Sequence, residues 1–309
     1  MFHGSIPAPL RSLIHEHAGA WPDGTDIYVG CSGNFTIERT LHARFGSDRR
    51  VHGNDITAYS CALGWFLAGE PPPFTLREEH EDVLGWLRPY LDTPADTLAT
   101  LMLGTRLLPM VGKFGTYYER MVAGTREQWP DMHAKTSAKL EALTVRLASF
   151  YAGDVRDFLD EVPSEAPVVM FPPFYSGDYQ AQFAAHGKFF DWPEPDWRDL
   201  DEDGKEQIIE QVHDRPNWVL GLHVERPELR EYLAGKVQTA NRGLPIYVYA
   251  ASGQRRIVRP RQATEPIPMP KIGADEEIGD RLTIHPLTGG QFAQIRSQFM
   301  SKRSCQDLR

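Results

Sequence analysis

The chain has 309 residues, of which 41% are hydrophobic and 24% are charged, and its formal net charge is −9 at pH 7. This composition is typical of a globular protein with a sizeable core, and the negative charge excludes a polycation that coats nucleic acid. No apolar run reaches the ~18 residues of a membrane span, and the N-terminus lacks a signal-peptide pattern. Three widely separated cysteines have no metal-ligand spacing, so we expect reduced thiols in a cytoplasmic protein without a metal site.

The charge is unevenly distributed along the chain. Residues 101–150 contain seven Lys and Arg against four Asp and Glu, whereas residues 191–210 contain nine Asp and Glu against two Lys and Arg. The first segment suits contacts with phosphates, and the second should face away from them. The alternative is that both segments are simply solvated faces.

The N-terminal part predicts a strand, a loop of small residues and a helix. After an expected helix over residues 5–20, residues 26–29 form a strand, the loop Gly30-Cys31-Ser32-Gly33-Asn34 follows, and a helix begins at Phe35. Glycines let the backbone approach a ligand closely, and the helix N-terminus offers free N–H groups. Because no Gly-Lys-Ser/Thr follows, the loop is not a phosphate-binding P-loop.

A second short strand over residues 51–54 ends at Asp55, about 20 residues after the glycine loop. At this spacing, nucleotide-binding α/β folds place an acid that accepts hydrogen bonds from both ribose hydroxyls. An Asp at a strand end is also a common helix N-cap, here for the buried helix expected over residues 57–67.

Residues 75–149 are expected to be mostly helical, and they separate the second strand from the third. We interpret this stretch as an inserted subdomain. Its centre reads Gly-Lys-Phe-Gly-Thr-Tyr-Tyr-Glu-Arg over residues 112–120. Cations beside paired tyrosines suit phosphate and base contacts, and the alternative is a mobile loop with an aromatic anchor.

The third strand end carries candidate residues for the adenine part of a ligand. Asp154 follows a strand end at residues 150–152, so its carboxylate could accept a hydrogen bond from a purine amino group while Val155 packs on the ring. An ordinary helix cap is the alternative.

The buried strand 168–170 must stop at Phe171-Pro172-Pro173-Phe174, because proline donates no N–H group. The proline carbonyls stay free to accept, and Phe174 could stack on a flat ligand. The alternative is a strand that leaves the sheet edge through a Pro-Pro turn.

The rest of the chain predicts a helix over 206–213, a strand over 218–222, a helix over 228–235, a strand over 245–250, a hairpin with four arginines over 253–261, and a loop and tail from 262. Strands that alternate with helices give an open, mainly parallel α/β sheet, in which ligands bind beyond the carboxyl ends of the strands. The glycine loop, Asp55, Asp154 and residues 171–174 are all predicted at those ends. We therefore expect an adenosine-type cofactor site beside a site for a flat substrate.

Four segments, in this order, resemble motifs of Dam-type S-adenosylmethionine-dependent DNA adenine methyltransferases. Residues 28–33 (Tyr-Val-Gly-Cys-Ser-Gly) resemble the cofactor loop, residues 52–56 the second motif and residues 153–155 the third. Phe171-Pro172-Pro173-Phe174 stands where the family has its catalytic Asp-Pro-Pro-Tyr motif. The similarity covers roughly residues 8–260 and extends to antirestriction adenine methyltransferases of mobile elements.

This resemblance implies a Rossmann-like methyltransferase sheet with an inserted helical subdomain. Residues 1–70 and 148–261 would form the α/β domain, 71–147 the DNA-recognition subdomain, and 262–309 a loop and tail. The cofactor would be S-adenosylmethionine and the partner double-stranded DNA with a flipped target base, without a membrane or a metal. The implied site residues are Tyr28, Gly30, Cys31, Ser32, Gly33, Asn54, Asp55, Asp154 and Val155 for the cofactor; Phe171, Pro172, Pro173 and Phe174 for catalysis; and Lys113, Tyr117, Tyr118, Arg120, Arg255 and Arg256 for nucleic acid.

The chain departs from the family at Phe171, where the family has an acid that accepts a hydrogen bond from the target amino group. A phenylalanine side chain cannot accept a hydrogen bond, so ordinary adenine methylation is in question. Asp178 or Asp191 is a candidate substitute acceptor. Three interpretations stay open: an active S-adenosylmethionine-dependent DNA-modifying enzyme, a non-catalytic DNA-binding antirestriction protein, and a related enzyme that acts on RNA or a small molecule.

Overall fold

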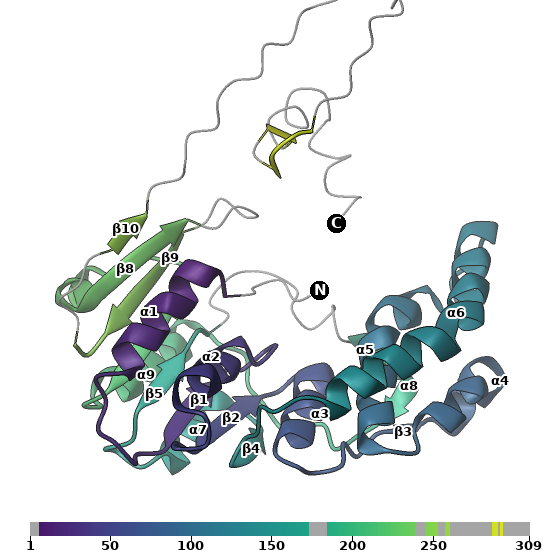
Figure 1. The fold of residues 1–309 in the computed structure, drawn as a ribbon, viewed down its shortest axis with the longest axis horizontal. Coiled ribbons are helices and arrows are strands. Elements are labelled where there is room, and N and C mark those ends of the chain that lie inside the picture. Colours follow the sequence, from purple (N-terminus) through teal and green to yellow (C-terminus); the bar gives the residue numbers. More distant parts are fainter. Residues whose placement is uncertain are drawn as a thin grey trace, which may run out of the picture. The chain divides into compact units, whose positions relative to one another are not determined.

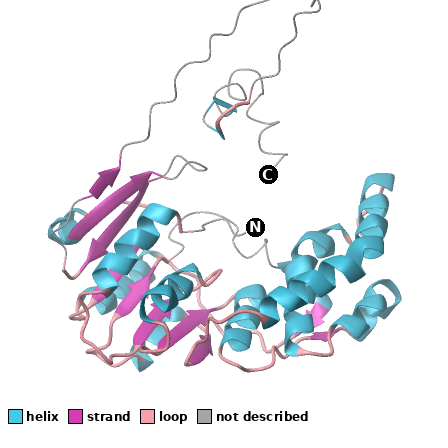
Figure 2. Cartoon of the chain, viewed as in Figure 1, coloured by secondary structure: helices cyan, strands magenta, loops and turns pink. Residues whose placement is uncertain are grey.

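The computed structural model describes residues 6–172, 184–238, 245–252, 257–259, 286–289 and 291–292. By their contacts, residues 1–259 form one compact unit and residues 260–309 a second, and the fold below is that of the first (Figures 1 and 2). Within the described ranges, no helix is long and apolar enough to cross a membrane.

The first unit is built on an eight-stranded sheet with the order β10-β8-β9-β7-β5-β1-β2-β4. Its strands are β1 (Ile27–Gly30), β2 (Val51–Asp55), β4 (Ser149–Ala152), β5 (Val168–Met170), β7 (Trp218–Leu222), β8 (Leu233–Gln238), β9 (Pro245–Ala250) and β10 (Ile257–Arg259). Strands β4, β2, β1, β5 and β7 pair in parallel, and β9 lies antiparallel between β7 and β8. This arrangement confirms the expected Rossmann-like methyltransferase sheet.

Helices cover both faces of the sheet, and the burial of the central strand β5 reflects this arrangement. All three of its residues are buried, as expected for a parallel strand covered on both sides. Val169 belongs to one hydrophobic cluster, whereas Val168 and Met170 belong to the other, because successive side chains point to opposite faces. The first cluster holds residues of α1 (Ala8–Ala18), α2 (Thr36–Phe45) and α3 (Ala58–Leu67), and the second holds residues of α7 (Val155–Glu161) and α9 (Glu202–His213).

The mostly helical stretch lies between α3 and β4, as predicted. It contains β3 (Thr75–Leu76), η1 (Glu78–His80), α4 (Glu81–Leu84), η2 (Gly85–Tyr90), α5 (Pro94–Leu107), η3 (Leu108–Met110) and the 26-residue α6 (Thr116–Glu141). Strand β3 pairs with β6 (Phe190–Asp191), which follows α8 (Ala184–Phe189), so the stretch also receives chain from beyond β5. The boundaries 71–147 for a separate subdomain stay a prediction.

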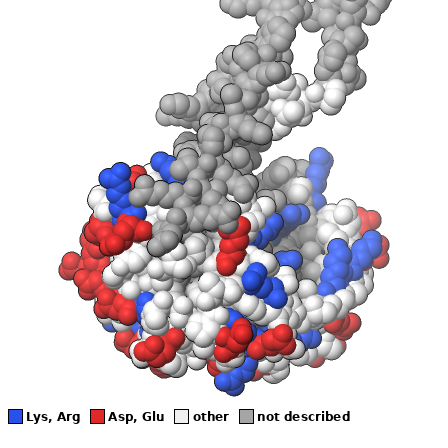
Figure 3. Space-filling view, turned by 60° about the vertical axis from the view of Figure 1, so that its left-hand side comes forward, with Lys and Arg blue, Asp and Glu red and all other residues white. Residues whose placement is uncertain are grey.

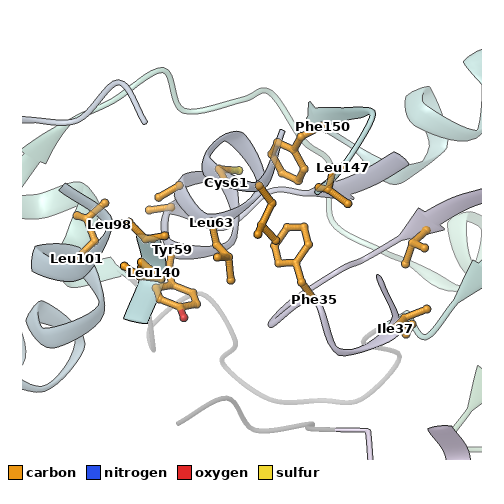
Figure 4. Packing of buried hydrophobic residues seen from close by; sticks show 14 of the residues in the cluster. Phe35, Ile37, Tyr59, Cys61, Leu63, Leu98, Leu101, Leu140, Leu147 and Phe150 are labelled. Atoms are coloured by element: carbon orange, nitrogen blue, oxygen red, sulfur yellow. The ribbon is translucent and has the colours of Figure 1, made fainter. Parts of the chain in front are cut away.

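Helix α3 joins the sheet to the helical stretch. It is apolar on nearly every side, which is typical of a helix without a solvent face. Figure 4 shows its side chains between Phe150 of the sheet on one side and Leu98 of α5 on the other. A Cβ atom placed on Gly64 would lie 2.3 Å from the Phe150 ring, so glycine is needed for this close approach.

One expectation near the C-terminal end of the sheet is wrong. Residues 228–235 are not one helix: η4 (Pro227–Tyr232) is a short 3₁₀ helix, and β8 begins at Leu233. Of the hairpin predicted over 253–261, the structure describes residues 257–259, which form β10 and pair in parallel with β8, and the other residues lie outside the described ranges. Pairing with strands distant in sequence decides the structure of β8 and β10, and local propensity does not report such pairing.

Candidate functional site

The predicted cofactor residues meet at the carboxyl ends of β1, β2 and β4, which are neighbours in the sheet. The loop after β1 is fastened to β2 by backbone contacts: the Ser32 N–H donates to the Asn54 carbonyl at 2.8 Å, and the Asn54 N–H donates to Ser32 Oγ at 3.2 Å. Cys31 (φ 56°) and Gly33 (φ 56°) adopt left-handed conformations, which is strained for the cysteine. The loop is therefore held in one tight shape.

The backbone of Gly30 lies very close to side chains of β5 and α7. A Cβ atom there would lie 2.7 Å from Met170 Cε and 3.1 Å from Val155 Cγ2. The loop thus packs on β5 and on the first residue of α7, and Val155 itself is buried.

Asp55 is buried and accepts hydrogen bonds at both carboxylate oxygens. Its Oδ2 accepts from the Gly33 N–H at 2.8 Å, and its Oδ1 accepts from the N–H groups of Ile56 (2.8 Å) and Thr57 (3.0 Å) and from Thr57 Oγ1 (3.2 Å). Burial raises the pKa of the Asp55 carboxyl, against the opposing effect of these donors. The N-cap of α3 is Thr57, so Asp55 does not have the capping role that was the alternative.

Asn54 connects three strand ends. Its Nδ2 donates to the carbonyls of Gly153 at 2.7 Å and Tyr151 at 3.2 Å, and its Oδ1 accepts from the Cys31 N–H at 3.5 Å. An amide is suited to this position because it donates and accepts at once. The asparagine therefore sets the spacing between the glycine loop and the turn that carries Asp154.

Asp154 forms a buried ion pair. Its carboxylate caps α7 through the Arg156 N–H (2.9 Å), accepts from Arg156 Nε (2.9 Å) and Nη2 (2.6 Å), and accepts from the Arg198 N–H (2.9 Å). Burial opposes ionisation, but the hydrogen bonds from Arg156 and Arg198 outweigh it and hold the pKa of this carboxyl well below its usual range. Asp154 is therefore the N-cap of α7, which was the alternative to a cofactor role. Its contact with a purine amino group stays a prediction.

Tyr28 lies on β1, and its ring packs on the face of the sheet. The ring is stacked on His52, with centroids 4.4 Å apart and an interplanar angle of 9°, and it also contacts Phe158 of α7. Its role toward a cofactor stays a prediction.

Phe171 follows β5, and its ring lies over the backbone of β7. A Cβ atom on Gly221 would be 2.1 Å from two ring carbons of Phe171. Pro172 is buried beside it, and Pro173 and Phe174 lie outside the described residues. Of the two candidate substitute acceptors, Asp178 also lies outside them, and Asp191 pairs with Arg77 at 3.3 Å on the small β3–β6 sheet.

The predicted nucleic-acid residues gather at the start of α6. Lys113 Nζ lies 5.3 Å from the centre of the Tyr118 ring, and Tyr117 packs edge-on against Tyr118. Lys113 and Arg120 are exposed and form no ion pair with any residue that the structure describes. Arg255 and Arg256 lie outside the described residues. On the drawn face, Figure 3 shows a cluster of acidic side chains at the left edge and several Lys and Arg side chains at the right, with both signs mixed along the lower margin.

Several residues of the site were not predicted from the sequence. Phe114 is 97% exposed between the glycines 112 and 115, next to Lys113, and its setting in an exposed cationic loop is the signal that could have identified it. Gly221 and Arg198 act through contacts with distant chain and carry no local signal, whereas Arg156 lies only two residues from its partner Asp154. In the described part of the chain, no group of three or more His, Cys, Asp and Glu side chains could hold a metal ion.

The family model described as "Phage DNA Adenine Methylase-like domain 1" matches residues 2–272. The chain belongs to this DNA adenine methylase-like family. The match spans the sheet, the glycine loop, the helical stretch and residues 171–174, which confirms the resemblance to Dam-type methyltransferases of mobile elements. The comparison with curated proteins gives no match.

Proposed function

We propose that this phage DNA adenine methylase-like protein is an S-adenosylmethionine-dependent enzyme that modifies double-stranded DNA. The observation that carries the proposal is the fastening of the glycine loop to Asn54 and Asp55 at the carboxyl ends of β1 and β2, within a chain of this family. In open α/β sheets this is where nucleotide-like ligands bind.

The residues present fit such a cofactor. The Asp55 Oδ2 makes one bond to Gly33 and keeps a lone pair for a ribose hydroxyl, and Val155 offers an apolar surface beside Gly30 for the adenine ring. The carboxylate of Asp154 is taken by Arg156 and Arg198, so we assign it to positioning the β4–α7 turn. When bound, the cofactor supplies an electrophilic methyl group.

The substrate side depends on residues 171–174. The Pro172 carbonyl can accept a hydrogen bond from an exocyclic amino group, but Phe171 offers no second acceptor. Loss of one positioned hydrogen-bonding group typically costs about 2.7–4 kcal/mol, or 10²–10³ in rate, by comparison with oxyanion-hole deletions. We therefore expect slow methylation.

We place the DNA contacts at Lys113, Phe114 and Tyr117, because exposed aromatic rings suit unstacked bases and an exposed cation suits phosphates.

The experiment that tests this function is nucleoside mass spectrometry on DNA from cells that express the protein, beside cells that express Asp55→Asn. A modified nucleoside that is present with the wild type and reduced or absent with the variant supports the proposal. Asn preserves the size of Asp55, but its amide nitrogen cannot accept, so in place of Oδ2 it loses both the bond from the Gly33 N–H and any bond from a ribose hydroxyl. An unchanged nucleoside profile with soluble wild-type protein contradicts it.

One observation favours a second function. The Phe171 ring is packed against Gly221, so the position of the family's acceptor is filled by a structural contact. A non-catalytic protein that binds DNA and protects a mobile element from restriction would retain the surface at the start of α6 without modifying DNA. Salt-dependent DNA binding together with an unchanged nucleoside profile would support this function.

A further inference from the structure

Three polar side chains form a hydrogen-bonded row at the amino-terminal ends of β1, β2 and β4. Asp26 directly precedes β1, His52 is the second residue of β2, and Ser149 is the first residue of β4. His52 and Ser149 are partners in the parallel ladder, so their side chains lie side by side on one face of the sheet. His52 Nδ1 lies 2.8 Å from Ser149 Oγ, and His52 Nε2 lies 3.3 Å from Asp26 Oδ2. The glycine loop follows the other end of β1, so this row is separate from the candidate cofactor site.

The charge of Asp26 decides the direction of these hydrogen bonds. Arg50 donates to both oxygens of the Asp26 carboxylate, from Nε at 3.0 Å and from Nη2 at 2.6 Å, and these bonds lower the pKa of that carboxyl. An ionised carboxylate can only accept, so the proton of the neutral imidazole is on His52 Nε2. The lone pair of His52 Nδ1 is then free to accept from the Ser149 hydroxyl.

His52 is neutral at pH 7 and can therefore act as a base. Burial lowers the pKa of its imidazole below the ordinary value of about 6.5, against the opposing effect of Asp26. The ring is also held in place, because it stacks on Tyr28 with centroids 4.4 Å apart and an interplanar angle of 9°. A hydroxyl, a base that can take its proton and an acid that orients the base are the three groups of a serine nucleophile.

The hydroxyl lies where a substrate can reach it. Ser149 is exposed, whereas the side chains of His52 and Asp26 are 13% and 23% exposed. Strand β4 is the last strand of the sheet, so no strand in the described part of the chain pairs with its outer edge. The backbone N–H groups of such an edge are free to donate, and donors of this kind stabilise the oxyanion that forms during acyl transfer.

We propose that Ser149, His52 and Asp26 form a second catalytic site, which hydrolyses small carboxylic esters through an acyl-serine intermediate. Ser149 Oγ attacks the ester carbonyl carbon while His52 Nδ1 takes the hydroxyl proton, and the bond from carbon to the leaving alcohol oxygen breaks as the alcohol takes that proton. Water, deprotonated by His52, then attacks the acyl carbon, releases the acid and restores the Ser149 hydroxyl. Asp26 is a positioning residue. The two ring nitrogens exchange the places that they have in serine proteases, but the roles of the three groups are the same.

The test is labelling of the full-length protein with a fluorophosphonate probe, whose phosphorus is attacked by a nucleophilic serine with loss of fluoride. Peptide mass spectrometry should place the adduct on Ser149 in the native protein and find none after heat denaturation. His52→Ala should slow labelling by about 10²-fold or more, which is typical for loss of a general base. Ser12→Ala, at an exposed serine of α1, and His42→Ala, at a histidine of α2, are matched controls and should leave the rate unchanged.

Two outcomes would overturn the proposal. The first is a native wild type in which Ser149 carries no adduct, or no more than Ser12 does. The second is an unchanged labelling rate in His52→Ala, which would mean that the three side chains only fasten neighbouring strands together. Because the labelling requires neither S-adenosylmethionine nor DNA, its result does not depend on the proposed function.

The pH profile of labelling tests the role of Asp26. Among the described residues, the charged groups that act on His52 are Asp26, which raises its pKa, and Arg50, which lowers it. Asp26→Asn should therefore move the midpoint of the profile to lower pH, in addition to slowing the reaction. A slower reaction with an unmoved midpoint would contradict the role of Asp26 as the acid that orients His52.

Discussion

The aromatic ring of Phe171 lies on the backbone of Gly221, the residue beside it on the neighbouring strand. Met170 of β5 pairs with Leu220 of β7, so residues 171 and 221 occupy the next positions at the carboxyl ends of these strands. A Cβ atom on Gly221 would stand 2.1 Å from the Cδ1 and Cε1 atoms of the ring. The first position of the family's catalytic motif is therefore engaged in packing here.

Gly221→Ala should destabilise the protein, because the new methyl group and the Phe171 ring cannot occupy the same space. Overpacking of this kind typically costs about 1–3 kcal/mol, which thermal unfolding would detect. Gly124→Ala is the control: it lies in α6 with nothing within 4 Å of the added Cβ atom, and we expect it to be neutral or slightly stabilising.

A double substitution identifies the ring as the cause. In Phe171→Ala/Gly221→Ala the clash is removed, so the free energy of unfolding should be higher than the sum of the two single effects predicts. Strictly additive effects would show that Gly221→Ala acts through another neighbour.

Phe171→Asp should raise methylation if the proposed chemistry operates. The new carboxylate restores an acceptor beside the Pro172 carbonyl, and we expect a gain of up to about 10²-fold in methyl transfer to adenine, measured with labelled cofactor on duplex DNA. Phe171→Leu, which also removes the ring but cannot accept, controls for loosened packing. Equal rates for the two variants would contradict an acceptor role at this position.

Asp154→Asn should lower stability in a pH-dependent way. Because the pKa of Asp154 is lowered on folding, its contribution is full above the ordinary Asp pKa of about 3.9 and is lost as the pH falls through and below that value. At pH 7 we expect a loss of about 3 kcal/mol or more, since Arg156 is left buried without its partner. The difference from wild type in denaturant unfolding should shrink below about pH 4.

Asp157→Asn provides the matched control for this measurement. Asp157 pairs with Arg198 at 2.6 Å, but its side chain is 52% exposed. An exposed ion pair contributes about 0–1 kcal/mol, so the control should lose little stability at pH 7. A similar loss in both variants would show that the Asp154–Arg156 pair is not the source of the effect.

Phe114→Ala should weaken DNA binding without changing stability. Its ring is 97% exposed, so truncation removes no packing, whereas stacking on a base is worth about 1–3 kcal/mol. Lys113→Ala should reduce the slope of log affinity against log salt by about 1. Val83→Ala, at an exposed residue of α4, is the control in the same fluorescence anisotropy titrations. Unchanged affinity for Phe114→Ala would mean that the recognition surface lies elsewhere.

The sequence was most informative where a segment's structure depends on its own residues. The run Val168–Met170 is the strand predicted for it, because three apolar residues before two prolines leave few alternatives. Strand β8 was missed because Leu233–Gln238 becomes a strand only by pairing with β9 and β10. In the site, the positions of Asp55 and Asp154 at strand ends could be predicted, and Thr57 and Arg156 donate to them from two positions away. The Arg198 N–H could not be predicted as a donor, because it reaches Asp154 from 44 positions away.

Helix α3 has a consequence for protein engineering. Eight of its residues are buried, and they contact the sheet on one side and α5 on the other. A shortened protein that lacked the helical stretch would leave Tyr59 and Leu63 facing water, and such a patch promotes aggregation. Excision of that stretch would therefore require a redesigned outer face for α3.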